Sequence, residues 1–400
     1  MINQKSKELG NNPSVIRDLF EYGKLRKQEI GEENVFDFSI GNPNVPPPQC
    51  VTDSLINLLK NTEPTKLHGY TSSTGDKFVR DEISNYLNKT YNTKTSGDLI
   101  YITAGAAASL TISLNAILNK DDEVIVFAPF FPEYRVFIEK ASGIVKIVNP
   151  VEPTFKPNFE ELEKVISNKT KAVIINSPNN PTGVVLNEED IITLTTILNK
   201  KQKEFNSKIY LISDEPYREL LYSNEKYPFI TNYYNNSIVC YSFSKSISLP
   251  GERVGYILVN PICDNVKDVF YAICGAGRAL GFVCAPTLLQ YLIPYCLGQT
   301  SDLNIYKENK DLLYNELTNL GYEVVKPDGA FYLFVKALEN DANKFSNTAK
   351  KFELLLVPSN SFGYNGYVRV SYCVSTKQIK NSIPAFEKLI NYYKREQTND

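Results

Sequence analysis

Apolar runs alternate with helix-like segments through the middle of the chain. Continuous apolar runs of this length are typical of strands buried on both faces, and their alternation with helices is typical of a mostly parallel sheet. The predicted strands are 99–105, 123–129, 143–148, 171–178, 209–217, 237–245 and 253–259. This pattern predicts an α/β fold in which a mostly parallel, doubly covered sheet forms the larger domain.

The pattern changes after about residue 265. Helical segments at 265–297 and 301–320 precede period-two segments at 322–337 and beyond, and the chain ends on a helical pattern. We therefore expect a smaller α+β domain, on which the amphipathic segment 14–30 packs. The expected division is an N-terminal arm at 1–45, a large domain at 46–290 and a small domain at 291–400.

Polar segments follow five of the predicted strands. They are TAG, APFFPEY, SPNNPTG, SDEPY and SFSK. In open α/β sheets the ligand lies outside the carboxyl ends of the strands. The spacing therefore predicts that these five segments meet at one pocket.

Composition excludes several classes of function. The 43 basic and 45 acidic residues leave a net charge of -2, which gives no basic face for nucleic acid or anionic lipid. We find no apolar run long enough for a membrane span and no apolar core of a secretory signal near the start. The seven cysteines form no CxxC motif, which favours a reducing compartment. We expect a cytoplasmic protein.

The chain has a single histidine, His68, which limits the possible chemistry. HExxH and His-rich metal sites need more than one histidine and are therefore excluded, and we expect no metal. A Ser-His-Asp triad would need His68, and no G-x-S-x-G surrounds a candidate serine. We expect His68 to be a loop residue and the proton carrier to be a lysine, a tyrosine, a carboxylate or a cofactor.

The segment SFSKSISLPGERVG (242–255) carries the strongest local signal. Lys245 follows an apolar strand, where partial burial lowers the pKa of an amine and favours Schiff-base chemistry. Arg253 beside a glycine-rich turn suits an anion such as phosphate. The alternatives are a solvated loop lysine and a surface ion pair.

This segment resembles the cofactor-lysine signature of the class I/II aminotransferase superfamily, the pyridoxal-phosphate (PLP) enzymes of fold type I. Further motifs of that family appear in order: GNP at 41–43, Y-x(4)-G at 70–75, TAGAAASL at 103–110, P-x-F-P-x-Y at 129–134, NNPTG at 179–183, DEPY at 214–217 and YVRVS at 367–371. The resemblance covers nearly the whole chain and is greatest to bacterial aspartate and aromatic aminotransferases.

The resemblance implies roles around the PLP ring. Lys245 would hold the cofactor covalently and then move a proton, and Asp214 would pair with the ring nitrogen. Tyr217 and Asn180 would hydrogen-bond the phenolate oxygen, and Phe131 would stack on the ring. From the residues alone, Asp214 could instead be a helix N-cap, NNPTG a plain turn and Phe131 a core residue.

The resemblance also implies a phosphate site and a dimer. The phosphate would be held by Gly105, Ala106, Ala107, Ser242, Ser244 and Arg253. Backbone N–H groups at a helix start form such a site, although tight packing would also explain these small residues. Many relatives have a hydroxyl or amide where this chain has alanines. Tyr70 would reach the phosphate of the neighbouring subunit, which implies a homodimer with shared active sites.

Three residues would hold the substrate carboxylate by the same resemblance. Arg369 in a strand-like segment needs a partner, and its fork would bind the α-carboxylate, with Gly41 and Asn180 beside it. Gly41 could also be an ordinary turn glycine. Arg278 stays open between a distal-carboxylate ligand of a neighbouring subunit and a structural ion pair. Its segment, CGAGRALG, lacks dinucleotide-binding spacing.

The implied function is a ping-pong transamination between an L-amino acid and a 2-oxo acid. Aspartate with 2-oxoglutarate leads, followed by aromatic or alanine-type donors. A PLP-dependent β-lyase or decarboxylase would carry the same motifs. A non-catalytic PLP-binding regulatory module is disfavoured, because about 40 residues precede the GNP motif and contain no basic recognition helix.

Overall fold

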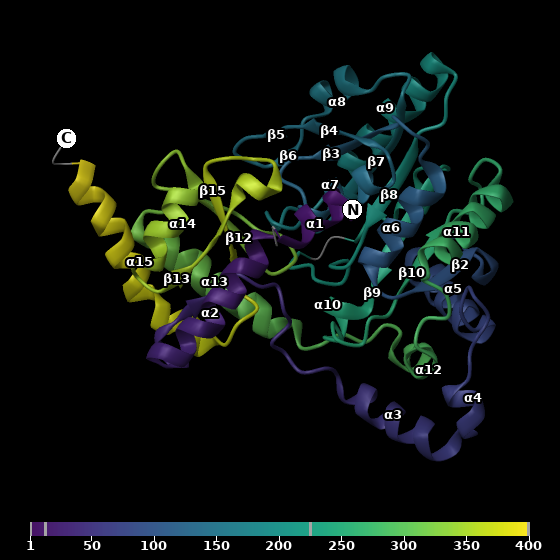
Figure 1. Cartoon of the computed structure of the whole chain (residues 1–400), viewed down its shortest axis with the longest axis horizontal. Coiled ribbons are helices and arrows are strands. Elements are labelled where there is room, and N and C mark those ends of the chain that lie inside the picture. The colour runs from purple at the N-terminus through teal and green to yellow at the C-terminus, as the bar shows by residue number, and fades with distance from the viewer. Residues whose placement is uncertain (1, 12–13, 224–225, 398–400) are drawn as a thin grey trace.

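A computed structural model describes residues 2–11, 14–223 and 226–397, and its larger part is built on a seven-stranded sheet (Figure 1). In spatial order the strands are β2 (Ile100–Thr103), β10 (Gly255–Val259), β9 (Ser237–Ser242), β8 (Tyr210–Asp214), β7 (Thr170–Asn176), β3 (Glu123–Phe127) and β4 (Ile144–Val148). β10 runs in the opposite direction to the other six strands, which are parallel to one another. The predicted mostly parallel sheet is therefore confirmed.

Helices cover both faces of this sheet. Along β7, Ala172 and Ile174 face one buried cluster, whereas Val173 and Ile175 face the other. The first cluster packs against α6 (Ala106–Ile117), α7 (Glu133–Lys140) and α11 (Val266–Leu280), and the second packs against α3 (Gln49–Asn61), α5 (Lys77–Tyr91), α8 (Phe159–Val165), α9 (Glu188–Phe205) and α12 (Thr287–Cys296). Burial on both faces explains why these strands are continuously apolar.

A smaller antiparallel sheet lies beside the first, in the yellow-green part of Figure 1. Its strands, in order, are β11 (Val324–Val325), β12 (Tyr332–Lys336), β15 (Tyr367–Ser371) and β14 (Val357–Pro358). It packs with α13 (Leu303–Leu320), α14 (Ala342–Lys350) and α15 (Thr376–Gln397). The expected smaller α+β unit is present.

The N-terminal segment packs on this smaller unit. Helix α2 (Val15–Ile30) buries Leu19 against Val357 and Phe362. Strand β1 (Phe36–Asp37) then pairs in parallel with β13 (Leu354–Leu355). Strand β1 is only two residues long, because the backbone N–H of Ser39 donates to the Asp37 side chain instead of to a neighbouring strand.

Two short helices and a helix break add detail that the pattern did not predict. Helices α1 (Gln4–Asn11) and α4 (Pro64–His68) were not expected, and α1 buries no residue. Gly281, with φ +78°, ends α11 within the helical pattern at 265–297. Buried residues of α12 belong to the large-sheet core, whereas Tyr306, Leu313 and Leu317 of α13 belong to the small-sheet core. No described helix is long and apolar enough to cross a membrane.

Candidate active site

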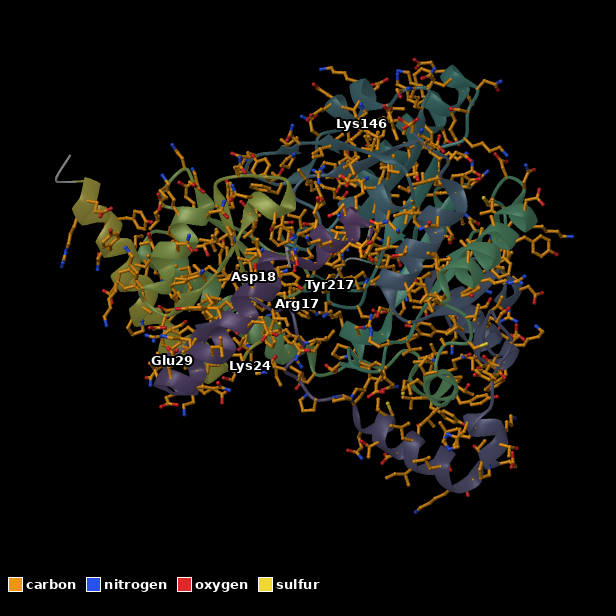
Figure 2. The ribbon with its side chains drawn as sticks, in the orientation of Figure 1. Arg17, Asp18, Lys24, Glu29, Lys146 and Tyr217 are labelled. Atoms are coloured by element: carbon orange, nitrogen blue, oxygen red, sulfur yellow. The ribbon has the colours of Figure 1, made fainter. Side chains whose placement is uncertain are left out.

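A cavity of about 260 Å³ lies at the carboxyl ends of the parallel strands. The segments after β2, β3, β7, β8 and β9 contribute Ala106, Phe131, Asn180, Tyr217 and Lys245 to its wall. The small sheet contributes Tyr332 and Arg369, and the N-terminal segment contributes Ile16 and Gly41. Figure 2 shows Tyr217 between the two sheets, close in this view to Arg17 at the start of α2. The five strand-end segments therefore meet as the spacing predicted.

Lys245 lies in α10 (Phe243–Ser246), a single turn that directly follows β9. Its Nζ donates a hydrogen bond of 2.6 Å to the carbonyl oxygen of Gly41. Burial lowers the pKa of the Lys245 amine to about 8, and the positive charges of Arg369 and Arg253 act in the same direction. A useful fraction of this amine is therefore neutral and nucleophilic near neutral pH.

Asp214 ends β8 and is buried with one oxygen satisfied and one not. Its Oδ2 accepts a hydrogen bond of 2.5 Å from the hydroxyl of Tyr134. Its Oδ1 has no hydrogen-bond partner among the described residues. Burial raises the pKa of the Asp214 carboxyl to about 7, and the Tyr134 hydrogen bond opposes this shift. A cationic N–H donor in the cavity would satisfy the free oxygen and favour the charged carboxylate.

Tyr134 is a site residue that sequence reasoning did not single out. It lies in the first turn of α7, and its ring packs edge-on against Phe131 at 5.8 Å. Burial keeps the pKa of the Tyr134 phenol well above its usual value, so the hydroxyl stays a neutral donor to Asp214. The P-x-F-P-x-Y motif contains this tyrosine, but nothing local indicated that it reaches a carboxylate 80 positions away.

Arg369 is buried on β15 without a carboxylate among its described partners. It donates to the side-chain oxygen of Asn180 at 3.0 Å and to the carbonyl of Ser39. Its guanidinium lies over the ring of Tyr332 at 4.6 Å, and its Nε has no described partner. Because no described carboxylate pairs with this arginine, its charge is available to a carboxylate that enters the cavity.

Tyr332 is the second residue that sequence reasoning missed. Its hydroxyl lies 2.8 Å from the hydroxyl of Tyr217. A Cβ added at Gly41 would lie 2.1 Å from the Tyr332 hydroxyl, so the close approach requires glycine at position 41. The sequence marked Tyr332 only as part of a period-two strand, because its partners lie far away along the chain.

The residues predicted for an anion meet at another part of the wall. Gly105, with φ +86°, immediately precedes α6, and an added Cβ would lie 2.7 Å from Nη2 of Arg253. Arg253 is anchored to the carbonyls of Pro250 at 2.9 Å and Ala104 at 3.1 Å. Further lining comes from Ala106, Ala107, Ser242 and Ser244. A helix N-terminus beside an arginine is suited to phosphate.

Two predicted residues do not reach this cavity within a single chain. The Tyr70 side chain is 97% exposed, and neither Tyr70 nor Arg278 lines the cavity. Arg278 is exposed near the end of α11. Tyr70 was predicted to act in a neighbouring subunit, whereas Arg278 was left open between a ligand of a neighbouring subunit and a structural ion pair. A single chain tests neither expectation. His68 was expected in a loop but is the last residue of the short helix α4, and it does not line the cavity.

Comparison with known proteins places this chain in a family. Residues 33–386 match the model of the family described as aminotransferase class I and II. The aspartate aminotransferase of Thermotoga maritima is 31% identical over 364 residues, covering 90% of this chain and 92% of that protein. The (5-formylfuran-3-yl)methyl phosphate transaminase of Methanocaldococcus jannaschii is 30% identical, with 92% and 94% covered.

Solved structures agree with these relatives. An amino transferase from Eubacterium rectale is 50% identical, with a TM-score of 0.96 over 98% of this chain and 99% of that chain. The Thermotoga maritima aspartate aminotransferase is 30% identical in its structure, with a TM-score of 0.86 over 98% of this chain and 100% of that chain. The chain belongs to the class I and II aminotransferase family, whose members generally depend on PLP, and it is an aminotransferase.

Proposed function

We propose that this aminotransferase uses PLP to move an amino group between an L-amino acid and a 2-oxo acid. The observation that carries the proposal is that a lysine with a lowered pKa and a buried carboxylate with an unpartnered oxygen line one cavity. A Schiff-base cofactor with a basic ring nitrogen uses both groups at once. None of the described residues donates a hydrogen bond to the free oxygen of Asp214.

The residues of the cavity fit PLP at each of its functional groups. Gly105, Ala106, Ala107, Ser242, Ser244 and Arg253 would hold the phosphate. Asp214 would accept from the ring nitrogen, Tyr217 and Asn180 would donate to the phenolate oxygen, and Phe131 would pack on the ring. When bound, PLP supplies an electron sink that makes the substrate Cα–H acidic.

Lys245 would act twice in this chemistry. Its amine would first hold the cofactor, for which it must be neutral, and its lowered pKa meets that requirement. Once the substrate amine has displaced it, Lys245 would carry the proton that leaves the substrate Cα. The carbonyl of Gly41, 2.6 Å from Nζ, would orient the lysine amine when it is free.

Arg369 would bind the substrate α-carboxylate in a bidentate pair, with Gly41 and Asn180 beside it. The guanidinium is already held by Asn180 and Ser39, so little side-chain entropy is lost on binding. Fixing the carboxylate in this way would orient the Cα–H toward Lys245.

Aspartate with 2-oxoglutarate is the proposed substrate pair, with aromatic or alanine-type donors next. Support comes from relatives named aspartate aminotransferases, although one relative of similar identity is named for a furan phosphate. The cations among the described lining residues are Lys245, Arg253 and Arg369, and each already has a role. A distal carboxylate would therefore need a further cation, for which Arg278 of a second copy remains the candidate.

We also propose a homodimer with shared active sites, in which Tyr70 contacts the phosphate held by the other copy. The exposure of Tyr70 supports this, because a free tyrosine ring gains from being covered. The division into an arm at 1–45, a large domain at 46–290 and a small domain at 291–400, and a cytoplasmic location, remain parts of the same proposal.

Reconstitution with PLP tests the proposed function. The wild-type protein should form a visible absorbance band, and borohydride should fix the cofactor to Lys245. Addition of aspartate should bleach the band and release one equivalent of 2-oxo acid. Lys245→Ala should form no fixable band, because no amine remains to hold the cofactor.

Lys24→Ala is the matched control, because Lys24 is an exposed lysine on α2 (Figure 2). This variant should behave as wild type. A wild-type protein that stays colourless with excess PLP would contradict the proposal. Substrate assignment alone would fail if alanine or phenylalanine bleached the band faster than aspartate did.

A further inference from the structure

Tyr332 connects the two parts of the cavity that belong to different sheets. It lies on β12 of the small sheet, paired with Ser371 of β15, and its side chain is 2% exposed. Its ring packs edge-on against the ring of Tyr217, which follows β8 of the large sheet, at 5.7 Å. A tyrosine so deeply buried must satisfy its hydroxyl within the protein or the ligand.

The hydroxyls of Tyr332 and Tyr217 form a hydrogen bond of 2.8 Å in which either can be the donor. Each phenol has one proton to give and can also accept. If Tyr217 gives its proton to the phenolate oxygen of PLP, its own oxygen is left to accept from Tyr332. Hydrogen bonds in such a chain polarise one another, so Tyr332 strengthens Tyr217 as a donor.

The face of the Tyr332 ring carries the second contact, the guanidinium of Arg369 at 4.6 Å. A cation over the ring draws electron density from it and makes the phenol a better donor. A carboxylate bound to Arg369 would offset that charge and weaken the effect. The hydroxyl also lies where any side chain at position 41 would clash, so its place is closely constrained.

We propose that Tyr332 is a positioning residue that links the carboxylate site at Arg369 to the hydrogen bond between Tyr217 and the cofactor. The link rests on the proposed function. It acts through the ring face on one side and the hydroxyl on the other. A carboxylate bound at Arg369 would thereby change the strength of the hydrogen bond from Tyr217 to the phenolate oxygen of PLP. The charge on that oxygen sets the protonation of the lysine–cofactor pair.

Two substitutions separate the two contacts. Tyr332→Phe removes the hydroxyl and keeps the ring over Arg369, whereas Tyr332→Leu removes both. Tyr322→Phe is the matched control, because Tyr322 is also a buried tyrosine of the small domain and its hydroxyl donates to the carbonyl of Phe386. Thermal unfolding of each PLP-loaded variant checks that the fold is retained.

The readout is the pH midpoint of the visible absorbance of the PLP-loaded protein. It is measured with and without propionate, a carboxylate without an amino group, at matched ionic strength. Tyr332→Phe should raise the midpoint by about half a pH unit, because a weaker donor at Tyr217 leaves more negative charge on the phenolate oxygen. It should also reduce the midpoint shift that propionate causes in the wild-type protein.

Propionate affinity gives the second readout. It should change less than twofold in Tyr332→Phe and fall by about tenfold in Tyr332→Leu, which loses the ring over Arg369. Tyr322→Phe should match the wild type in midpoint, propionate shift and affinity.

An unchanged midpoint or an unchanged propionate shift in folded Tyr332→Phe would overturn the role of Tyr332 and leave the proposed function standing. A wild-type protein without a visible band would overturn the proposed function and this inference together.

Discussion

Burial shifts the pKa values of the two residues that define the site in opposite directions. It lowers the pKa of the Lys245 amine to about 8 and raises that of the Asp214 carboxyl to about 7. Both shifts favour the neutral form, because a low-dielectric site disfavours any unpaired charge. In the ligand-free protein each group is therefore suited to gain a partner: a carbonyl for the amine and a cationic N–H for the carboxylate.

Asp214→Asn should change the pH dependence of stability in the ligand-free protein. A folded pKa raised from 3.8 to about 7 means that the wild-type protein loses stability as the pH rises between these two values, and the loss is nearly complete above about 7. The full loss is about 4 kcal/mol at most. The variant should lack this slope, and urea unfolding of both proteins between pH 5 and pH 8 would show the difference.

Asp18→Asn, a change at an exposed acid on α2, is the control and should keep the wild-type slope. The transamination rate of Asp214→Asn should fall by about a hundredfold or more, because this is the typical effect of removing one preorganised electrostatic partner. Parallel stability curves for wild type and Asp214→Asn would contradict the buried titration.

Residues marked by motifs were predictable, and those defined only by a distant contact were not. Lys245, Asp214, Asn180 and Arg369 all line the cavity, as expected from their strand ends and motifs. The hydroxyl contacts of Tyr134 and Tyr332 span 80 and 115 positions. Local periodicity marks such tyrosines only as core residues.

At the scale of elements, the junction of β2 and α6 forms the proposed phosphate site. The strand ends at Thr103, Gly105 adopts φ +86°, and the helix starts at Ala106. That conformation aims the first N–H groups of α6 at the cavity while leaving room for Arg253. A glycine meets both requirements, since an L side chain is strained there and would meet the guanidinium.

Gly105→Ala should weaken PLP binding by about tenfold and destabilise the protein by about 1–2 kcal/mol. Equilibrium dialysis gives the affinity, and urea unfolding gives the stability. Gly251→Ala is the control, because an added Cβ there meets nothing within 4 Å and the residue lies two positions from Arg253. Equal PLP affinity in wild type and Gly105→Ala would rule out this junction as the phosphate site.

Long apolar elements were predictable because burial on both faces leaves an unbroken pattern, as in β7 and β8. Short elements were not. Strand β1 has two residues and exists only because β13 lies beside it. Helix α1 buries nothing, so it carries no hydrophobic periodicity to detect.

At the scale of the whole molecule, the cavity depends on how the two sheets are placed. Arg369 and Tyr332 come from the small sheet, and Lys245, Asp214 and Tyr217 come from segments of the large one. In the proposed dimer, Tyr70 is the residue that would contact the phosphate in the cavity of the second copy.

Tyr70→Phe should leave the unfolding free energy of the isolated chain unchanged within about 0.5 kcal/mol, because the side chain is 97% exposed. In the proposed dimer the substitution should speed PLP dissociation by about tenfold, because one charge-assisted hydrogen bond from Tyr70 to the phosphate is lost. Light scattering gives the oligomeric state, and loss of the visible band gives the dissociation rate. A monomer with wild-type PLP retention would contradict the shared site.

The sequence by itself determined the α/β class and the strand ends that carry polar residues, because burial periodicity and strand-end motifs are local properties of the chain. Its resemblance to a known family indicated most residues of the cavity. Tertiary structure decided the partners of Asp214 and Arg369, the tyrosine pair at positions 217 and 332, and the exposure of Tyr70. Those features depend on the relative placement of distant elements, which no local pattern specifies.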